Sequence, residues 1–162
     1  MLTQARLKEL LHYDPETGLF TRLVRTSNST KVGDVVGTAG KGGYLACSID
    51  WKFHQMHRLA FLYMTGSFPV YDVDHINHDV ADNRWSNLRD VPETTNMQNE
   101  IKTRRNNSAG LMGAQWRADR QKWTAVLLID GKKRRFGSFD TAEEAHSAYL
   151  KAKREHHTGF IL

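Results

Sequence analysis

Chemically active side chains are concentrated between residues 72 and 99 of this 162-residue chain. Asp74 and His75 are adjacent, and amide side chains follow at Asn87 and Asn96. A hard cation such as Mg²⁺ prefers oxygen ligands, and it needs only one or two from the protein when water and a phosphate complete its shell. Asp74 and the Asn96 side-chain carbonyl could supply two oxygens, while His75 could accept a proton from water. This combination predicts metal-assisted hydrolysis of a phosphate ester.

The elements around the pair must bring two neighbouring side chains to one point. Adjacent residues of a regular strand face opposite sides, so we expect the strand predicted at 70–76 to end or bulge at Asp74 and His75. A polar loop at 77–86, a second short strand at 87–91 and a polar helix at 93–104 follow in the prediction.

The residues before this cluster predict a small mixed scaffold. Leu7, Leu10 and Leu11 recur at helical spacing and indicate a helix over 3–12. A turn at 14–18, rich in Asp, Pro and Gly, leads into short strands between 18 and 56. A helix over 56–65 has an apolar face and is followed by Gly66, a common residue after a helix end.

Several motifs in this half resemble the HNH endonucleases of the ββα-metal class, in particular the phage and intron homing type. The resemblance covers roughly residues 12–100. The matching residues are His57-Arg58-Leu59-Ala60, Asp74-His75-Ile76-Asn77, Asp82-Asn83-Arg84-Trp85-Ser86-Asn87-Leu88-Arg89 and Asn96.

This resemblance implies a role for each matching site residue. His75 would be the general base, Asp74 a metal ligand, and Asn87 the residue that holds the loop behind the histidine. Asn96 would be a second metal ligand on a helix, at the position where other branches of the family have histidine. The implied cofactor is Mg²⁺ or Mn²⁺. Many relatives also bind a structural zinc through Cys pairs; Cys47 is the single cysteine here, so we expect no structural zinc.

Other polar residues of this half keep two interpretations each. Arg58 and Arg84 could contact the DNA backbone or form surface ion pairs. Glu100 could assist the metal site or be a solvated helix residue, and whether His78 assists is left open. The His-x-x-His pairs superficially suggest zinc, but a zinc ion there would remove His75 from acid–base chemistry.

Charge is unevenly divided along the chain. The formal net charge is +5, yet residues 1–100 contain 10 Lys and Arg against 12 Asp and Glu, whereas residues 101–162 contain 13 against 6. A basic half indicates a module that binds a polyanion, with a solvated basic surface as the alternative. The aperiodic stretch 101–110, with Lys102, Arg104 and Arg105, is typical of a linker that could also contact DNA.

The basic half predicts a three-stranded antiparallel sheet with one packed helix. Strand-like runs at 112–118, 122–129 and 133–139 include an Asp130-Gly131 hairpin signal. A helix over 141–157 opens with a capping-box pattern, Thr141 to Glu144. The fold class is therefore α+β, with an HNH module at 1–100 and a sheet-and-helix module at 111–162.

This second half resembles an AP2 domain, which implies a sheet that enters the DNA major groove. The residues that carry the resemblance are Gly113-Ala114-Gln115-Trp116, Lys122-Trp123-Thr124-Ala125, Gly137 to Ala145, and Ala148-Tyr149. Strand alternation places Gln115, Arg117, Lys133 and Arg135 on the face opposite the helix, where they could bind phosphates or guanine edges. Val126 and Leu128 depart from the charged residues that the plant family has there.

Together these patterns predict a metal-dependent DNA endonuclease of the homing type that acts on double-stranded DNA. A DNA-binding regulator with an inactive HNH remnant is the main alternative, and a metal-binding or RNA-binding interaction protein is a third. No apolar run reaches the roughly 20 residues of a membrane span, and the N-terminus lacks a signal-peptide pattern. We therefore expect no membrane partner and a cytoplasmic location, in a host cell if the gene is from a phage. The sequence leaves the oligomeric state open, with a monomer slightly favoured.

Overall fold

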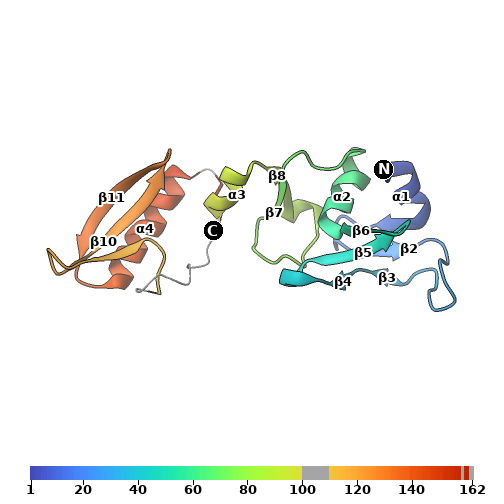
Figure 1. Ribbon diagram of the computed structural model, residues 1–162, viewed down its shortest axis with the longest axis horizontal. Helices are drawn as coiled ribbons and strands as arrows, with labels where there is room; N and C mark the ends of the chain where they lie inside the picture. The colour runs from blue at the N-terminus through green and yellow to red at the C-terminus, as the bar shows by residue number, and fades with distance from the viewer. Residues whose placement is uncertain (100–109, 158, 161–162) are drawn as a thin grey trace. The chain divides into compact units, whose positions relative to one another are not determined.

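The protein was analysed as a computed structural model, which describes residues 1–99, 110–157 and 159–160. The chain forms two compact units, Met1–Glu93 and Thr94–Leu162 (Figure 1). Each unit is described by itself below. Nearly all of the expected linker at 101–110, including Lys102, Arg104 and Arg105, lies outside the described residues, as does Glu100.

The first unit begins with helix α1 (Gln4–Leu10), capped by the Thr3 side chain, which accepts a hydrogen bond from the Arg6 amide. Two small antiparallel sheets follow, one with strand order β1-β2-β3 and one with order β4-β5-β6. Their strands are β1 (Leu11–Tyr13), β2 (Phe20–Arg22), β3 (Val35–Val36), β4 (Thr38–Ala39), β5 (Leu45–Ile49) and β6 (Lys52–Gln55). The helix expected over 3–12 is shorter because its last residues pair with β2 as β1.

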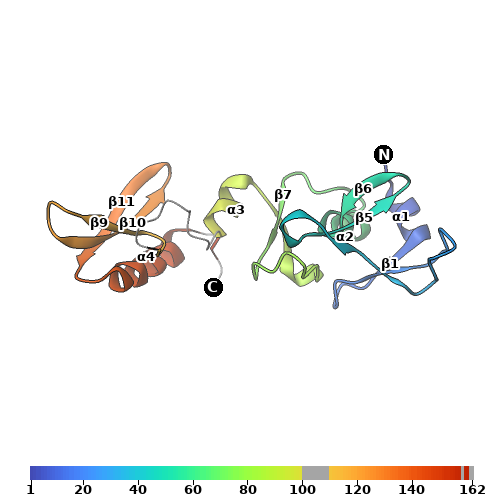
Figure 2. The ribbon, with the colours of Figure 1, turned by 60° about the horizontal axis from the view of Figure 1, so that its bottom comes forward.

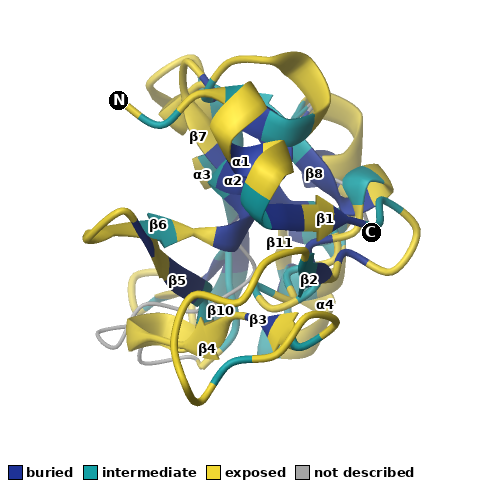
Figure 3. Ribbon diagram, turned by 90° about the vertical axis from the view of Figure 1, so that its right-hand side faces the viewer, coloured by how far each residue is buried: buried dark blue, intermediate teal, exposed yellow. Residues whose placement is uncertain are grey.

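Helix α2 (Met56–Thr65) lies in the core of the first unit, and Figure 3 colours part of its ribbon as buried. Leu59 and Ala60 are fully buried, and they share one apolar cluster with Leu7 of α1 and Phe20 of β2. The helix ends at Gly66, whose left-handed φ of 85° favours glycine at this position. The core therefore fixes α2 against both sheets.

Strands β7 (Asp72–His75) and β8 (Leu88–Val91) form a separate antiparallel pair, with a short 3-10 helix, η2 (Trp85–Asn87), just before β8. In this pair Asp74 lies opposite Arg89 and His75 lies opposite Leu88. The strand expected at 70–76 is therefore shorter, and Asp74 and His75 are its last two residues.

The second unit contains helix α3 (Glu93–Asn99), which starts at the boundary, and a three-stranded antiparallel sheet of order β11-β10-β9. Helix α4 (Ala142–His156) packs on the sheet, as Figures 1 and 2 both show. The strands are β9 (Ala114–Arg117), β10 (Lys122–Ile129) and β11 (Lys132–Phe139). Ala125 and Leu127 of the sheet meet Tyr149 and Ala152 of α4 in a small apolar core.

Two local predictions in this unit are confirmed. The side chain of Thr141 accepts from the Glu144 amide, and the Glu144 side chain accepts from the Thr141 amide, which is a complete capping box. Asp130 and Gly131 have φ values of 50° and 74°, as a tight hairpin between β10 and β11 demands. In the described residues, no helix has both the length and the apolar character needed to cross a membrane.

Candidate active site

The Asp74–His75 pair lies at the end of β7 and is almost fully buried. Asp74 is 7% exposed and His75 is 4% exposed, although both are polar. The chain turns immediately after them, since the His78 amide donates to the His75 carbonyl at 3.0 Å. Strand β7 therefore ends at His75, and the side chains of Asp74 and His75 are both buried.

The loop behind the pair is held by Asn87, which is 6% exposed. Its Oδ1 accepts from the Asn77 amide at 2.9 Å, and its Nδ2 donates to the Asp82 carbonyl at 2.8 Å. One buried amide thus joins both ends of the loop, using a donor and an acceptor that would be costly to leave unpaired.

Asn83 contacts the histidine itself and determines which ring nitrogen carries the proton. The Asn83 Nδ2 donates to the Ala81 carbonyl at 3.3 Å, so Oδ1 is the atom that faces His75, with Nε2 of the histidine 3.3 Å away. A carbonyl oxygen can only accept, so His75 carries its proton on Nε2 in the neutral state and its lone pair on Nδ1. This geometry assigns Nδ1 as the basic nitrogen.

Two rings, those of His57 and Tyr44, pack against His75 and favour its neutral form. His57 of α2 meets the His75 ring edge to face at 5.2 Å, and Tyr44 lies 5.4 Å from His57 and 5.9 Å from His75 between ring centroids. Burial lowers the pKa of His75, and burial together with the charge of a protonated His75 lowers the pKa of His57 to about 4. Neutral imidazole is the form that can accept a proton.

The turn between β1 and β2 supports the site loop from the other side. The Tyr13 hydroxyl donates to the Asn83 carbonyl at 2.7 Å, and the Trp85 amide donates to the Pro15 carbonyl at 2.9 Å. Gly18 lies so close that a Cβ there would be 2.4 Å from the Arg84 amide nitrogen. The turn signal at 14–18 identifies the segment that provides these supports, but the contacts themselves were not predicted from the sequence.

Asp74 is held by Arg89 from the neighbouring strand. The Arg89 Nε and Nη2 atoms lie 2.8 and 2.6 Å from the same carboxylate oxygen, Oδ2. This ion pair follows from the register that sets the two residues opposite each other, and the sequence analysis did not identify it. A buried carboxylate at a strand end is a fitting oxygen ligand for Mg²⁺ or Mn²⁺; a metal ion there would compete with the guanidinium.

The second predicted ligand, Asn96, lies half-buried on α3 in the second unit. Its joint use with Asp74 stays a prediction. Within residues 1–99, 110–157 and 159–160, no three His, Cys, Asp or Glu side chains come together in a way that could hold a metal ion. Of the His-x-x-His pairs, His54 stacks on Phe68 at 6.1 Å, while His57 packs on His75.

The two arginines predicted for DNA contact in this unit have protein partners. Arg58 donates to the Pro69 and Tyr71 carbonyls at 3.3 and 3.5 Å, which supports the chain just before β7. Arg84 binds Asp82 through three short contacts, and this guanidinium lowers the pKa of Asp82 to about 2. Arg84 remains half-exposed, whereas the Arg58 contacts are structural.

The structure brings all four residues predicted for the sheet face of the second unit together. Gln115, Arg117, Lys133 and Arg135 line one groove of about 370 Å³, whose floor includes Thr124 and Val126. Arg117 pairs with Asp119 at 2.8 Å. The pairing of Val126 with Arg135 and of Leu128 with Lys133 explains the grouping, because residues directly opposite in an antiparallel pair share a face.

The buried Asp-His pair and its asparagine-bound loop lie in a segment with a recognisable family. Residues 54–98 match the HNH endonuclease family, and they include Asp74, His75, Asn87 and Asn96. Protein 3.8 of Escherichia phage T7 is 32% identical over 111 residues, which cover 68% of this chain and 90% of that protein. The chain therefore belongs to the same family as Protein 3.8 and carries an HNH endonuclease domain.

A solved structure titled "DNA binding and cleavage by the HNH homing endonuclease I-HmuI" also resembles the chain. The identity is 19%, the match covers 93% of this chain and 88% of that chain, and the TM-score is 0.44.

Proposed function

We propose that the protein is a metal-dependent DNA endonuclease of the homing type. The observation that supports this most directly is the buried Asp74–His75 pair at the end of β7, with the base nitrogen of His75 assigned by Asn83. In this proposal His75 is the general base, and Asp74 and Asn96 hold Mg²⁺ or Mn²⁺. Glu100 and His78 are assigned no role in it.

The reaction is in-line hydrolysis of a DNA phosphodiester. Nδ1 of His75 takes a proton from water as the water oxygen bonds to phosphorus, and the bond from phosphorus to the 3′-oxygen breaks. Asn83 keeps the Nε2 proton in place, so that the lone pair stays on Nδ1, and Asn87 keeps the loop that carries Asn83 folded. When bound, the divalent ion supplies Lewis-acid stabilisation of the charge that develops on the phosphate oxygens.

The second unit would then provide the main binding energy for double-stranded DNA as an AP2-like domain. Its groove presents Lys133, Arg135 and Gln115 on the sheet face opposite α4. Lys133 and Arg135 form no ion pair within the described residues, so both cations can bind phosphate. We propose a nuclease domain at 1–100, a basic linker at 101–110 that adds Lys102, Arg104 and Arg105, and the DNA-binding domain at 111–162.

Plasmid cleavage with Mg²⁺ or Mn²⁺ tests the proposal. We expect the native chain to cleave and His75→Ala to lose cleavage by a factor of about 100 or more, as for the loss of a general base. His54→Ala is the matched control, because His54 is another histidine of the first unit, on β6, and it packs on Phe68 rather than on His75. Equal cleavage by the His75→Ala and His54→Ala variants would refute the assigned base.

One observation favours a second candidate function, a DNA-binding regulator with an inactive HNH domain. The carboxylate expected to bind metal is engaged by Arg89 on two nitrogens. If a metal ion does not displace Arg89 from Asp74, the chain would bind DNA without cutting it. DNA binding with no cleavage on plasmid or on DNA from its own locus, in either metal, would select this function.

A further inference from the structure

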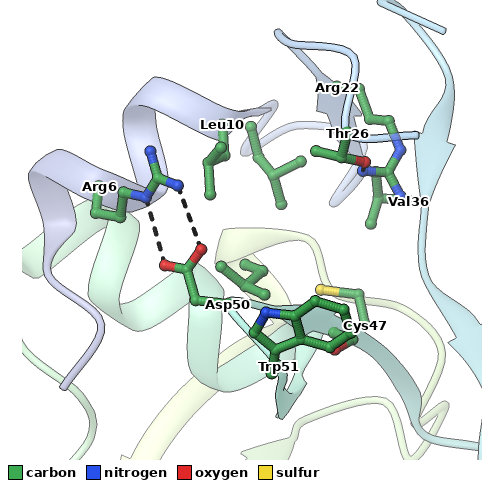
Figure 4. Close-up of a pocket in the computed structure, with 11 residues that line it drawn as sticks. Arg6, Leu10, Arg22, Thr26, Val36, Cys47, Asp50 and Trp51 are labelled. Atoms are coloured by element: carbon green, nitrogen blue, oxygen red, sulfur yellow. Dashed lines mark hydrogen bonds and ion pairs between the residues drawn. The ribbon is translucent and has the colours of Figure 1, made fainter. Parts of the chain in front are cut away.

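A second concave site lies in the first unit between α1, the segment after β2 and the tip of the β5–β6 hairpin. It has a volume of about 340 Å³, within the range of roughly 300–1,000 Å³ that is common for small-ligand sites. Its lining has an apolar part that includes Leu10, Leu11 and Ile49. Arg22 and Trp51 also line it and are labelled, with Leu10, in Figure 4. None of these residues has a part in the proposed cleavage.

Trp51 occupies a position that gains nothing from packing or from local conformation. Its side chain is fully exposed, at 101% of the reference area, which leaves a large apolar surface in water. Its φ of 66° and that of Asp50, 47°, lie in the left-handed region, where Asn-Gly would form the same hairpin turn without a bulky side chain. A residue kept in a strained and solvated position is a sign of function.

The tip of the hairpin contacts α1. Arg6 of α1 binds the Asp50 carboxylate through Nε and Nη2 at 3.4 and 3.2 Å, as the dashed lines in Figure 4 show. This contact joins the turn to a helix on the other side of the pocket. Trp51 is therefore presented on a turn that is restrained on one side, which lowers the entropy cost of binding a planar group.

Arg22 is the cation that the pocket offers to a ligand. Arg6 pairs with both Asp50 and Glu9, whereas Arg22 donates to the neutral Thr26 hydroxyl at 3.0 Å and forms no ion pair within the described residues. Burial raises the pKa of the Cys47 thiol to about 11, so the pocket lining carries no thiolate at neutral pH. A pocket lined by one available cation and one exposed aromatic ring fits a ligand with both a phosphate and a planar base.

We propose that this pocket binds an unpaired nucleotide of the DNA, with its base stacked on Trp51 and its phosphate at Arg22. The inference rests on the proposed function for the identity of the polymer. The site would bind a nucleotide released from a duplex near the cut, independently of the groove in the second unit. Stacking of this type is tolerant of sequence, because each base has an aromatic face.

Fluorine NMR of the full chain with fluorinated tryptophan tests the site directly. The probe is tetradeoxythymidylate, in EDTA so that cleavage has no influence, and Trp51→Gly assigns the Trp51 resonance while suiting the left-handed turn. We expect the Trp51 resonance to move with the oligonucleotide. The proposal is overturned if the Trp51 resonance does not move once the oligonucleotide has saturated the second unit. It is also overturned if a fully paired duplex shifts the Trp51 resonance equally.

Binding measurements with matched variants complete the test. Trp51→Gly is expected to weaken oligonucleotide binding at this site about tenfold, and Phe53→Ala is the control, since Phe53 is 79% exposed on the same hairpin but does not line the pocket. Arg22→Gln is expected to reduce the slope of log affinity against log salt by about 0.7. Equal losses from the Trp51→Gly and Phe53→Ala variants, or an unchanged slope, contradict the proposed pocket.

The two proposals fail separately. A chain that shows the Trp51 shift but never cleaves loses the nuclease assignment alone. A chain that cleaves but shows no shift loses the nucleotide pocket alone.

Discussion

Substitution of Gly18 by alanine tests whether the β1–β2 turn supports the candidate active site. Gly18 has a φ of 73°, and an added Cβ would lie 2.4 Å from both the Arg84 amide nitrogen and the Asn83 carbonyl carbon. Both of these neighbours are backbone atoms, which cannot rotate away as a flexible side chain can. The methyl group must therefore move the turn and the site loop apart.

The expected cost has two parts. A left-handed conformation costs an L-residue about 1–2 kcal/mol. Forcing extra volume into a closed contact costs about 1–3 kcal/mol more. The sum of about 2–5 kcal/mol is a large part of the roughly 5–15 kcal/mol that stabilises an ordinary domain. Gly33 provides the matched control, because its φ is 89° and nothing lies within 4 Å of an added Cβ. Gly33→Ala should show the conformational part alone.

Urea unfolding, monitored by hydrogen–deuterium exchange mass spectrometry, separates the conformational cost from the steric cost. Peptides from α2 report the first unit without interference from the second unit. We expect the Gly18→Ala variant to lose at least about 1 kcal/mol more than the Gly33→Ala variant, and to lose cleavage because the loop that carries Asn83 is displaced. If the two variants lose the same free energy and cleave equally, the turn does not support the site.

Three further predictions concern charged and titratable groups. The pKa of His57 is about 4 in the folded protein and about 6.5 when unfolded. Above pH 6.5 His57 is neutral in both the folded and the unfolded protein. Between pH 6.5 and pH 4 only the unfolded protein binds the proton on His57. The free energy of unfolding should therefore fall by about 3 kcal/mol as the pH drops from 6.5 to 4. His57→Phe should remove that part of the decrease in urea titrations at the two pH values, and an identical decrease in the variant would contradict the assignment. Arg89→Met should destabilise the protein in EDTA by about 3–5 kcal/mol, since it removes a cation from the buried Asp74 carboxylate. Mg²⁺ should raise the melting temperature of that variant more than that of the native chain, and an equal rise would argue against a metal at Asp74. In the second unit, Arg135→Gln should reduce the slope of log affinity for duplex DNA against log salt by about 0.9, whereas Lys151→Gln on α4 should leave it unchanged; equal slopes for both variants would exclude the sheet face.

The features that could be predicted from the sequence are those set by neighbours in the chain. The capping box at Thr141 and the hairpin at Asp130-Gly131 depend on a few consecutive residues, so propensity and turn chemistry identify them. Strand alternation likewise grouped Gln115 and Arg117 with the cations of β11, since β9 and β11 both pair with β10 and residues opposite each other share a face.

The contacts that complete the candidate site join residues far apart in the chain. Arg89 reaches Asp74 over a separation of 15 residues, and Tyr13 reaches the Asn83 carbonyl over a separation of 70. Their formation depends on tertiary packing, which periodicity does not encode. The ion pairs of Arg84 and Arg117 have a different origin: each aspartate is only two residues away, but the sequence does not say whether a cation turns to it or to solvent.

The site is organised by turns and buried side chains rather than by a large sheet. Within the described part of the chain, β7 pairs only with β8, and an isolated strand pair is marginally stable in water. Asn87 and the β1–β2 turn therefore supply what the sheet does not, and Arg89 places a cation on the buried Asp74 carboxylate. If Asp74 holds a metal ion as proposed, binding would exchange one cation for another, so its net free energy would be smaller than that of filling an open carboxylate site. A DNA phosphate would assist the exchange, because it ligates the metal ion and offers the released guanidinium a new anion.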